Sequence, residues 1–286
     1  MIKVRPDVKI SSTGGISCYL DNAVLSSSDL KEFSFRAKLS EQYSTNHGTN
    51  VFDDVIYKTE FIRAFRRLIP RLKLTGTEKV LEMGAGHGWA SVLLKRHFPA
   101  CYIVASDLVS EALQFCVHYE QILGLSIDEK WAFHCRAIPF DDNTFDRIFT
   151  MAAFHHFGQN NDFTGALEEM IRILKPNGKI ALLYEPSAPR FLYPLINKIV
   201  NSRRSEENVD EDVLVISDLR KYSEKAGCKC NIEYYPDFRD RSGLKSQLYY
   251  FFLSKVAPLV GFTPLLKLAV CCVNITIEKG PAKSTA

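Results

Sequence analysis

Three glycines at alternate positions follow a short apolar run and precede a helical pattern. The segment reads Glu82-Met83-Gly84-Ala85-Gly86-His87-Gly88. Glycines let a backbone turn tightly and approach a ligand where a Cβ would clash, and the amino terminus of the following helix offers unpaired N–H groups. A dinucleotide-binding loop would place its third glycine at position 89, which is Trp89 here. Glu82, ahead of the glycines, suits a ligand that carries an ammonium group rather than a pyrophosphate.

A second acid stands at the end of the next apolar run. Asp107 follows residues 102–106, and a carboxylate at this point of a nucleotide-binding fold accepts hydrogen bonds from ribose hydroxyls. A glycine-rich loop by itself is often a plain turn. The strand before it, the helix after it and the acid together predict a binding loop.

These residues need elements that hold them together, and the chain between 78 and 185 supplies them. The expected strands are 78–83, 102–106, 130–135, 145–151 and 179–184, and the expected helices are 89–97, 109–123 and 163–174. Short strands that alternate with helices predict a parallel sheet covered on both faces. Further strands are expected at 228–235 and 270–278, after helices at 191–200 and 216–226.

Four motifs in order resemble the class I S-adenosylmethionine-dependent methyltransferases, in their type 11 small-molecule group. They are the glycine loop at 80–89, the turn IPFDDNTFD at 138–146, the segment AFHHF at 153–157 and the hairpin ILKPNGK at 173–179. The resemblance implies an α/β fold with a Rossmann-like, doubly wound, mostly parallel seven-stranded sheet. It implies that the last strand is antiparallel, that helical cap insertions are added, and that S-adenosylmethionine is the cofactor.

The resemblance also implies a role for each matching residue. The methionine end of the cofactor would be held by Glu82, Gly84, Ala85, Gly86 and Gly88, and the ribose by Asp107. The adenine would be bordered by Leu108, Cys135, Arg136 and Ala137, and the methyl group would face Thr150 and Met151. One departure concerns the third strand, where the family often has Gly-Asp-Ala and the Asp binds the adenine amino group. This chain has Phe133-His134-Cys135 there, so that contact must come from the backbone or from another group.

Methyl transfer from a sulfonium mainly requires alignment of the acceptor with the methyl group, but a hydroxyl or carbon acid also needs a base. His155 and His156 are the candidates, because imidazole titrates near neutrality; the alternative is that both are structural. Tyr43 and His47, in a segment that the family often closes over its cofactor, and Glu185, after the fifth strand, are further candidates. No metal site is expected, since no His follows position 156.

Nearly half of the chain lies outside this core. We expect an N-terminal cap or lid at 1–77 and a methyltransferase domain at 78–286, with insertions at 186–215 and 236–267 that form the acceptor cap. The aromatic, weakly charged stretch 246–267 predicts either a buried cap or an interfacial patch for peripheral membrane contact. Its uncharged run, 256–266, is too short to span a bilayer.

Composition excludes several classes. The 286 residues are 46% hydrophobic and 24% charged, with a net charge of +3, as in an average soluble protein and too mild for a nucleic-acid partner. Residues 1–7 lack the apolar core of a secretory signal, and eight cysteines are too few for a disulfide scaffold. These features predict a cytoplasmic protein, with peripheral contact at the inner membrane face as an option.

The sequence therefore predicts an S-adenosylmethionine-dependent methyltransferase for a small-molecule or lipid-linked acceptor, with O- or C-methylation favoured over N-methylation. Two alternatives stay open. One is a non-catalytic, cofactor-binding partner subunit. The other, disfavoured by the position of Gly88, is a nicotinamide-dependent oxidoreductase. Acceptor identity and oligomeric state are left open.

Overall fold

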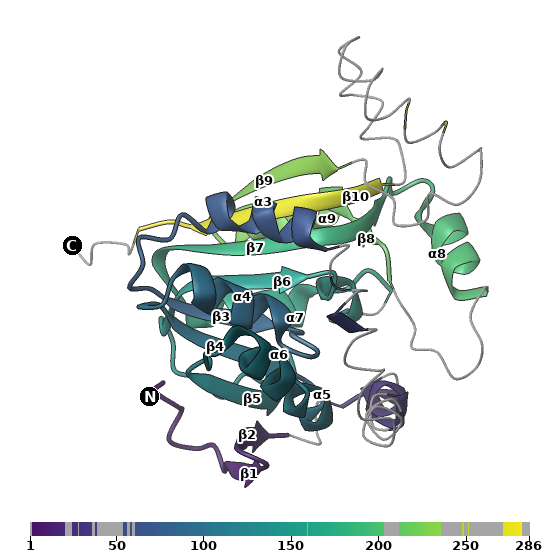
Figure 1. The fold of residues 1–286 in the computed structure, drawn as a ribbon. Helices are drawn as coiled ribbons and strands as arrows, with labels where there is room; N and C mark the ends of the chain where they lie inside the picture. The colour runs from purple at the N-terminus through teal and green to yellow at the C-terminus, as the bar shows by residue number, and fades with distance from the viewer. Residues whose placement is uncertain are drawn as a thin grey trace.

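The computed structural model describes residues 2–20, 25–27, 29–35, 38, 54–55, 58, 61–158, 160–202, 212–235, 248, 251 and 271–281. Tyr43, His47 and most of the 246–267 stretch lie outside these described residues. Within them, ten strands form one sheet in the order β1-β2-β5-β4-β3-β6-β7-β10-β9, with β8 paired to β7 (Figure 1).

The seven strands expected from the sequence form the centre of this sheet. They are β3 (Lys79–Met83), β4 (Tyr102–Asp107), β5 (Glu129–Phe133), β6 (Phe145–Met151), β7 (Leu174–Ala188), β9 (Cys228–Tyr235) and β10 (Cys271–Lys279). The pairs among β5, β4, β3, β6 and β7 are parallel, and β10 runs antiparallel between β7 and β9. The Rossmann-like prediction is therefore confirmed, including the antiparallel last strand.

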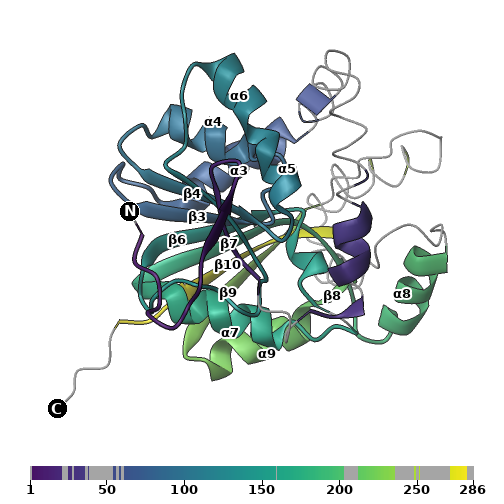
Figure 2. The ribbon, with the colours of Figure 1, turned by 90° about the horizontal axis from the view of Figure 1, so that it is seen from below.

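Helices cover both faces of the sheet. They include α3 (Ile62–Leu72), α4 (Trp89–His97), α5 (Ser110–Gln114), α6 (Cys116–Leu123), α7 (Thr164–Ile173), α8 (Tyr193–Ser202), α9 (Ile216–Lys225) and the 3-10 turn η2 (Phe154–His156). Figure 2 shows α3, α4 and α6 on one side of the sheet and α7 and α9 on the other. The expected helix 109–123 is divided at Phe115 into α5 and α6.

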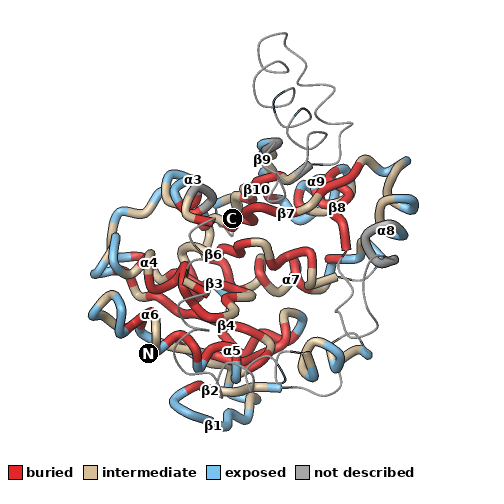
Figure 3. The backbone as a smooth tube through the Cα atoms, turned by 45° about the vertical axis from the view of Figure 1, so that its right-hand side comes forward, coloured by how far each residue is buried: buried red, intermediate tan, exposed pale blue. Residues whose placement is uncertain are grey.

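Two apolar clusters, one on each face, hold the sheet in place. One is centred on fully buried rings, among them Phe140, Phe145 and Phe154. The other joins Phe65 and Leu68 of α3 to Trp89 of α4. The buried backbone in Figure 3 follows the central strands. Dense packing of this kind makes the strand ends a rigid base for the loops that follow them.

The first twenty residues extend the sheet, although their sequence pattern predicted no strand there. The hairpin of β1 (Ser11–Thr13) and β2 (Ile16–Tyr19) adds to its edge, and β2 pairs in parallel with β5. A third additional strand, β8 (Leu214–Val215), pairs with the end of β7. Among the described residues, no helix combines the length and the apolar character that crossing a bilayer requires.

Candidate functional site

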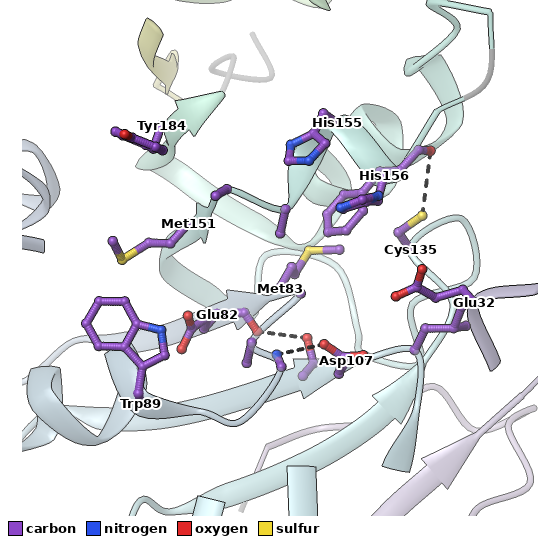
Figure 4. A pocket seen from close by; sticks show the side chains of 18 of the residues that line it. Glu32, Glu82, Met83, Trp89, Asp107, Cys135, Met151, His155, His156 and Tyr184 are labelled. Carbon is purple, nitrogen blue, oxygen red and sulfur yellow. Dashed lines mark hydrogen bonds between the residues drawn. The ribbon is translucent and has the colours of Figure 1, made fainter. Parts of the chain in front are cut away.

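A cavity of about 520 Å³ lies at the carboxyl ends of β3, β4, β5 and β6, within the size range of small-molecule sites. Ten of the residues predicted to form the site line it. They are Glu82, Gly84, Ala85, Gly86, Asp107, Leu108, Cys135, Met151, His155 and His156. Figure 4 shows Glu82 at one end, near Trp89, Met151 and Tyr184, and Cys135 at the other, with Asp107 between them.

The three glycines of the loop serve different purposes. Gly84, Gly86 and Gly88 have φ values of 70°, 53° and 73°, in the left-handed region. A Cβ on Gly84 would lie 2.6 Å from the Cβ of Ala153, so this glycine lets the loop pass close to the segment after β6. A Cβ on Gly86 would meet nothing within 4 Å, because this residue faces the open cavity. Gly86 therefore leaves room for a ligand against the backbone.

Glu82 is a buried acid at the carboxyl end of β3. Its Oε2 accepts hydrogen bonds from the backbone N–H and the hydroxyl of Ser91, at 2.9 and 2.5 Å. Burial, with a smaller contribution from the charge of Asp107, raises the pKa of Glu82 to about 8, although the Ser91 hydrogen bonds oppose this. A ligand cation beside Glu82 would favour the ionised form, so the residue suits an ammonium group.

Asp107 joins the end of β4 to the glycine loop. Its Oδ2 accepts the N–H of Gly86 at 2.7 Å (Figure 4), and its Oδ1 accepts the N–H of Val109 at 3.2 Å. These bonds orient the carboxylate in the cavity wall. A carboxylate has about four acceptor positions, so Asp107 retains capacity for two hydroxyl donors of a ligand.

The opposite wall holds a histidine that is fixed by a fully buried glutamate. Nδ1 of His155 lies 2.8 Å from Oε2 of Glu185. Glu185 also accepts the N–H groups of Ala153, Phe154 and His155 and the hydroxyl of Thr150, at 3.0–3.2 Å. Since a carboxylate only accepts, the ring proton sits on Nδ1, and Nε2 is left as the acceptor. The Nε2 atom of His155 is thus left as an acceptor in a residue that lines the cavity, whereas Glu185 does not line the cavity.

A β-bulge in β7 separates the directions of two neighbouring side chains. Leu183 and Tyr184 together oppose the single residue Asn274, and the N–H of Tyr184 donates to Oδ1 of Asn274 at 3.1 Å. Tyr184 has a φ of 63°, a strained value for a side-chain-bearing residue. The bulge sends Glu185 under the loop after β6 and leaves Tyr184 in the cavity wall, with its ring centroid 5.9 Å from that of Phe61.

Four predicted site residues, Gly88, Thr150, Ala137 and Arg136, do not line the cavity. Gly88 packs α4 against α6, since a Cβ there would lie 2.7 Å from Sγ of Cys116. Thr150 is fully buried and donates to Glu185. Ala137 is buried in the turn after β5. The side chain of Arg136 lies against α7, because a Cβ added to Gly165 would be 3.3 Å from its Cδ.

The segment before β3 contributes cavity residues that the motifs did not reveal. Asp29, Glu32, Lys58 and Phe61 all line the cavity. The only signal for them in the sequence is local: Ser26 and Asp29 have the spacing of a helix-capping box. Which part of the cavity such a helix reaches depends on long-range contacts. Among the described residues, no cluster of three His, Cys, Asp or Glu side chains could hold a metal ion.

The same segment is tied to the glycine loop by a buried polar contact. Nδ1 of His87 lies 3.0 Å from Oδ2 of Asp54, and the hydroxyl of Tyr119 donates to the same oxygen. The ring of His87 also lies 4.5 Å from that of Phe115. Residues before β3 therefore help to fix the loop that faces the cavity.

Comparison with known proteins agrees with this geometry. Residues 81–182 match the family model described as a methyltransferase domain. The chain is 32% identical over 117 residues to a fatty-acid O-methyltransferase of Mycolicibacterium smegmatis, covering 41% of this chain and 40% of the relative. It is 25% identical over 142 residues to a demethylmenaquinone methyltransferase of Thermus thermophilus, covering 50% and 63%. The aligned region thus spans less than two thirds of either relative.

The fold is shared with solved structures. One is a phosphoethanolamine N-methyltransferase of Haemonchus contortus in complex with S-adenosyl-L-methionine, with a TM-score of 0.57 and 17% identity. The match covers 93% of this chain and 62% of that one. At this identity, the similarity concerns the fold.

Proposed function

Because the chain belongs, through this domain, to the class I S-adenosylmethionine-dependent methyltransferases, we propose that it transfers a methyl group to a small-molecule or lipid-linked acceptor, at oxygen or carbon. The observation that carries the proposal is the arrangement of the cavity. Acids that suit the cofactor lie on one side, and a histidine oriented as a base lies on the other.

The donor and acceptor groups of the cavity fit the cofactor. Glu82 and Lys58 would hold the ammonium and carboxylate of its amino-acid end, and Asp107 its ribose hydroxyls. Leu108 and Cys135 would border the adenine. When bound, S-adenosylmethionine supplies a methyl group on a positively charged sulfur, which is a good leaving group.

His155 would accept the proton that the acceptor loses. Its Nε2 is available as a base because Glu185 binds the opposite ring nitrogen. Such a base favours an acceptor that is still protonated at neutral pH, namely a hydroxyl or an acidic carbon. Glu185 acts through His155 and is a positioning residue.

The lining near Tyr184 supports an apolar acceptor. Phe61, Trp89, Met151 and Tyr184 are each at most 9% exposed and border this end of the cavity. The names of the two relatives specify a fatty acid and demethylmenaquinone as acceptors of those proteins. Segments 1–77, 186–215 and 236–267 would complete the acceptor side, and 246–267 would supply any membrane contact.

Transfer of a labelled methyl group tests the function. Purified protein is incubated with methyl-labelled S-adenosylmethionine and, separately, with a lipid extract and a polar metabolite extract. We expect label in one fraction, and a His155→Ala variant should bind the cofactor normally while its transfer rate falls about 10²–10⁴-fold. Cofactor binding without transfer to either extract would favour the non-catalytic partner subunit. Absence of binding below the millimolar range would overturn the proposal.

The affinity for S-adenosylhomocysteine, which carries the same ammonium group, should rise with pH between about 6 and 8. Since the pKa of Glu82 is about 8, an ion pair with the ligand at lower pH first requires a proton to leave. Each pH unit below 8 then reduces the affinity by up to about tenfold, and the dependence flattens above pH 8.

Calorimetry in buffers of different ionisation enthalpy measures this effect, and close to one proton should be released per ligand below pH 8. The Glu82→Gln variant serves as the control, because it should bind more weakly and lose the slope. A flat profile in the wild type, or an unchanged slope in the variant, would contradict the assignment of Glu82.

A further inference from the structure

A histidine stands where the family often has the acid that binds the adenine amino group. His134 is 2% exposed, and its Nδ1 accepts the N–H of Arg136 at 3.2 Å. The ring proton therefore sits on Nε2, which lies 3.3 Å from Oδ1 of Asp29. An imidazole engaged at both nitrogens has no acceptor left for a ligand amine. Its contact with Asp29 fixes the helical residues 29–35 beside the end of β5.

Asp29 is itself bound at both carboxylate oxygens. Its Oδ2 accepts the N–H and the hydroxyl of Ser26 at 2.7 and 2.6 Å, and its own N–H donates back to the Ser26 hydroxyl at 3.2 Å. This is a reciprocal capping box at the start of the helix. Burial alone would raise the pKa of Asp29, but hydrogen bonds from His134 and Ser26 lower this pKa to about 2. Asp29 is thus a charged anchor for the helix.

Glu32 lies three residues after Asp29, on the same face of the helix. It also lines the cavity. Figure 4 shows its carboxylate beside Cys135, at the end of the cavity remote from Glu82. Four acids line the cavity; Asp29 is bound to His134 and Ser26, and the other three follow one another in the order Glu82, Asp107 and Glu32. Their order matches the hydrogen-bond donors along S-adenosylmethionine, which are the ammonium group, the ribose hydroxyls and the purine amino group.

We propose that Glu32 accepts a hydrogen bond from the exocyclic amino group of the adenine, in place of an acid at the end of β5. This inference rests on the proposed cofactor. His134 and Asp29 are the positioning residues, because they fix the helix that carries Glu32. Through Glu32, the segment before β3 would thereby contribute to the recognition of adenine over a purine that lacks the amino group.

A binding cycle with two ligands separates this contact from a general structural role. One ligand is S-adenosylhomocysteine, and the other is the analogue whose purine carries hydrogen in place of the amino group. The wild type should bind the first at least about tenfold more tightly, as expected for a hydrogen bond to a charged group. In Glu32→Ala the two affinities should agree within about twofold. Glu32→Gln keeps an acceptor oxygen and should give an intermediate ratio.

Lys31→Ala is the matched control, since Lys31 is exposed on the same helix and should leave the wild-type ratio unchanged. A merely structural role for Glu32 would weaken both ligands equally, so an unchanged ratio in Glu32→Ala would overturn the inference. If the wild type binds neither ligand, the proposed function itself fails. If it binds both with equal affinity, only the amino contact fails.

Discussion

Replacing Glu185 with alanine is expected to lower the free energy of unfolding by about 3–5 kcal/mol, the range for removing one partner of a buried, charged hydrogen-bond network. The substitution would leave the backbone donors of Ala153, Phe154 and His155, and the ring of His155, without their acceptor. These groups are buried or nearly so, and each unsatisfied donor is costly. The loop after β6 would then lose its fixed conformation.

Thermal unfolding followed by circular dichroism measures this effect. With a shift of about 2–4 °C per kcal/mol for a chain of this size, the melting temperature should fall by roughly 10 °C. Glu185→Gln keeps the volume and one acceptor oxygen, so its loss should be smaller. Glu224→Ala, at an exposed site on α9, should change stability by less than about 0.5 kcal/mol. Equal stability of Glu185→Ala and Glu224→Ala would show that Glu185 does not hold this loop.

The elements that the sequence predicted well are those whose pattern is local. Strands such as β3 and β6 are short apolar runs bounded by turn residues, and their order in a parallel sheet follows from the handedness of β-α-β connections. The glycine loop was recognisable because left-handed backbone and close approach each require glycine. Residues such as Glu82 and Asp107 were predicted to meet at one cavity because both end parallel strands.

The missed features depend on contacts between distant segments. Nothing near position 29 indicates that Asp29 will meet His134, and β2 has no partner in its own part of the sequence except β1. The role of Glu185 was hidden for a similar reason. A β-bulge opposite Asn274 reverses the direction in which successive side chains of β7 point, and no residue of β7 signals that irregularity.

Together, these contacts show which parts of the cavity wall come from segments outside the core sheet and which come from its strands. The segment before β3 reaches the cavity with Glu32, Lys58 and Phe61 and is anchored by His134 and the glycine loop. The strands that come late in the sequence, β7 among them, supply the cavity wall around Tyr184. The segment before β3 would therefore contribute to both sides of the cavity, with Glu32 and Lys58 toward the cofactor and Phe61 toward the acceptor.

Asp107→Ala is expected to weaken S-adenosylhomocysteine binding by more than about 100-fold. The carboxylate would no longer accept the ribose hydroxyls, and charged hydrogen bonds contribute about 1.5–3 kcal/mol each. Gly86 and Val109 would also lose the acceptor that orients the loop. Titration calorimetry of the variant and the wild type at one pH measures the change.

The matched control lies near the opposite end of β4. Asp128 accepts the N–H of Ile103 at 2.7 Å and pairs with Lys95, but it does not line the cavity. Asp128→Asn should therefore reduce stability and leave the ligand affinity unchanged. Asp107→Asn keeps one acceptor oxygen and should lie between alanine and the wild type. Should Asp107→Ala and Asp128→Asn bind the ligand equally well, Asp107 would not hold the ribose, because only one of the two carboxylates faces the cavity.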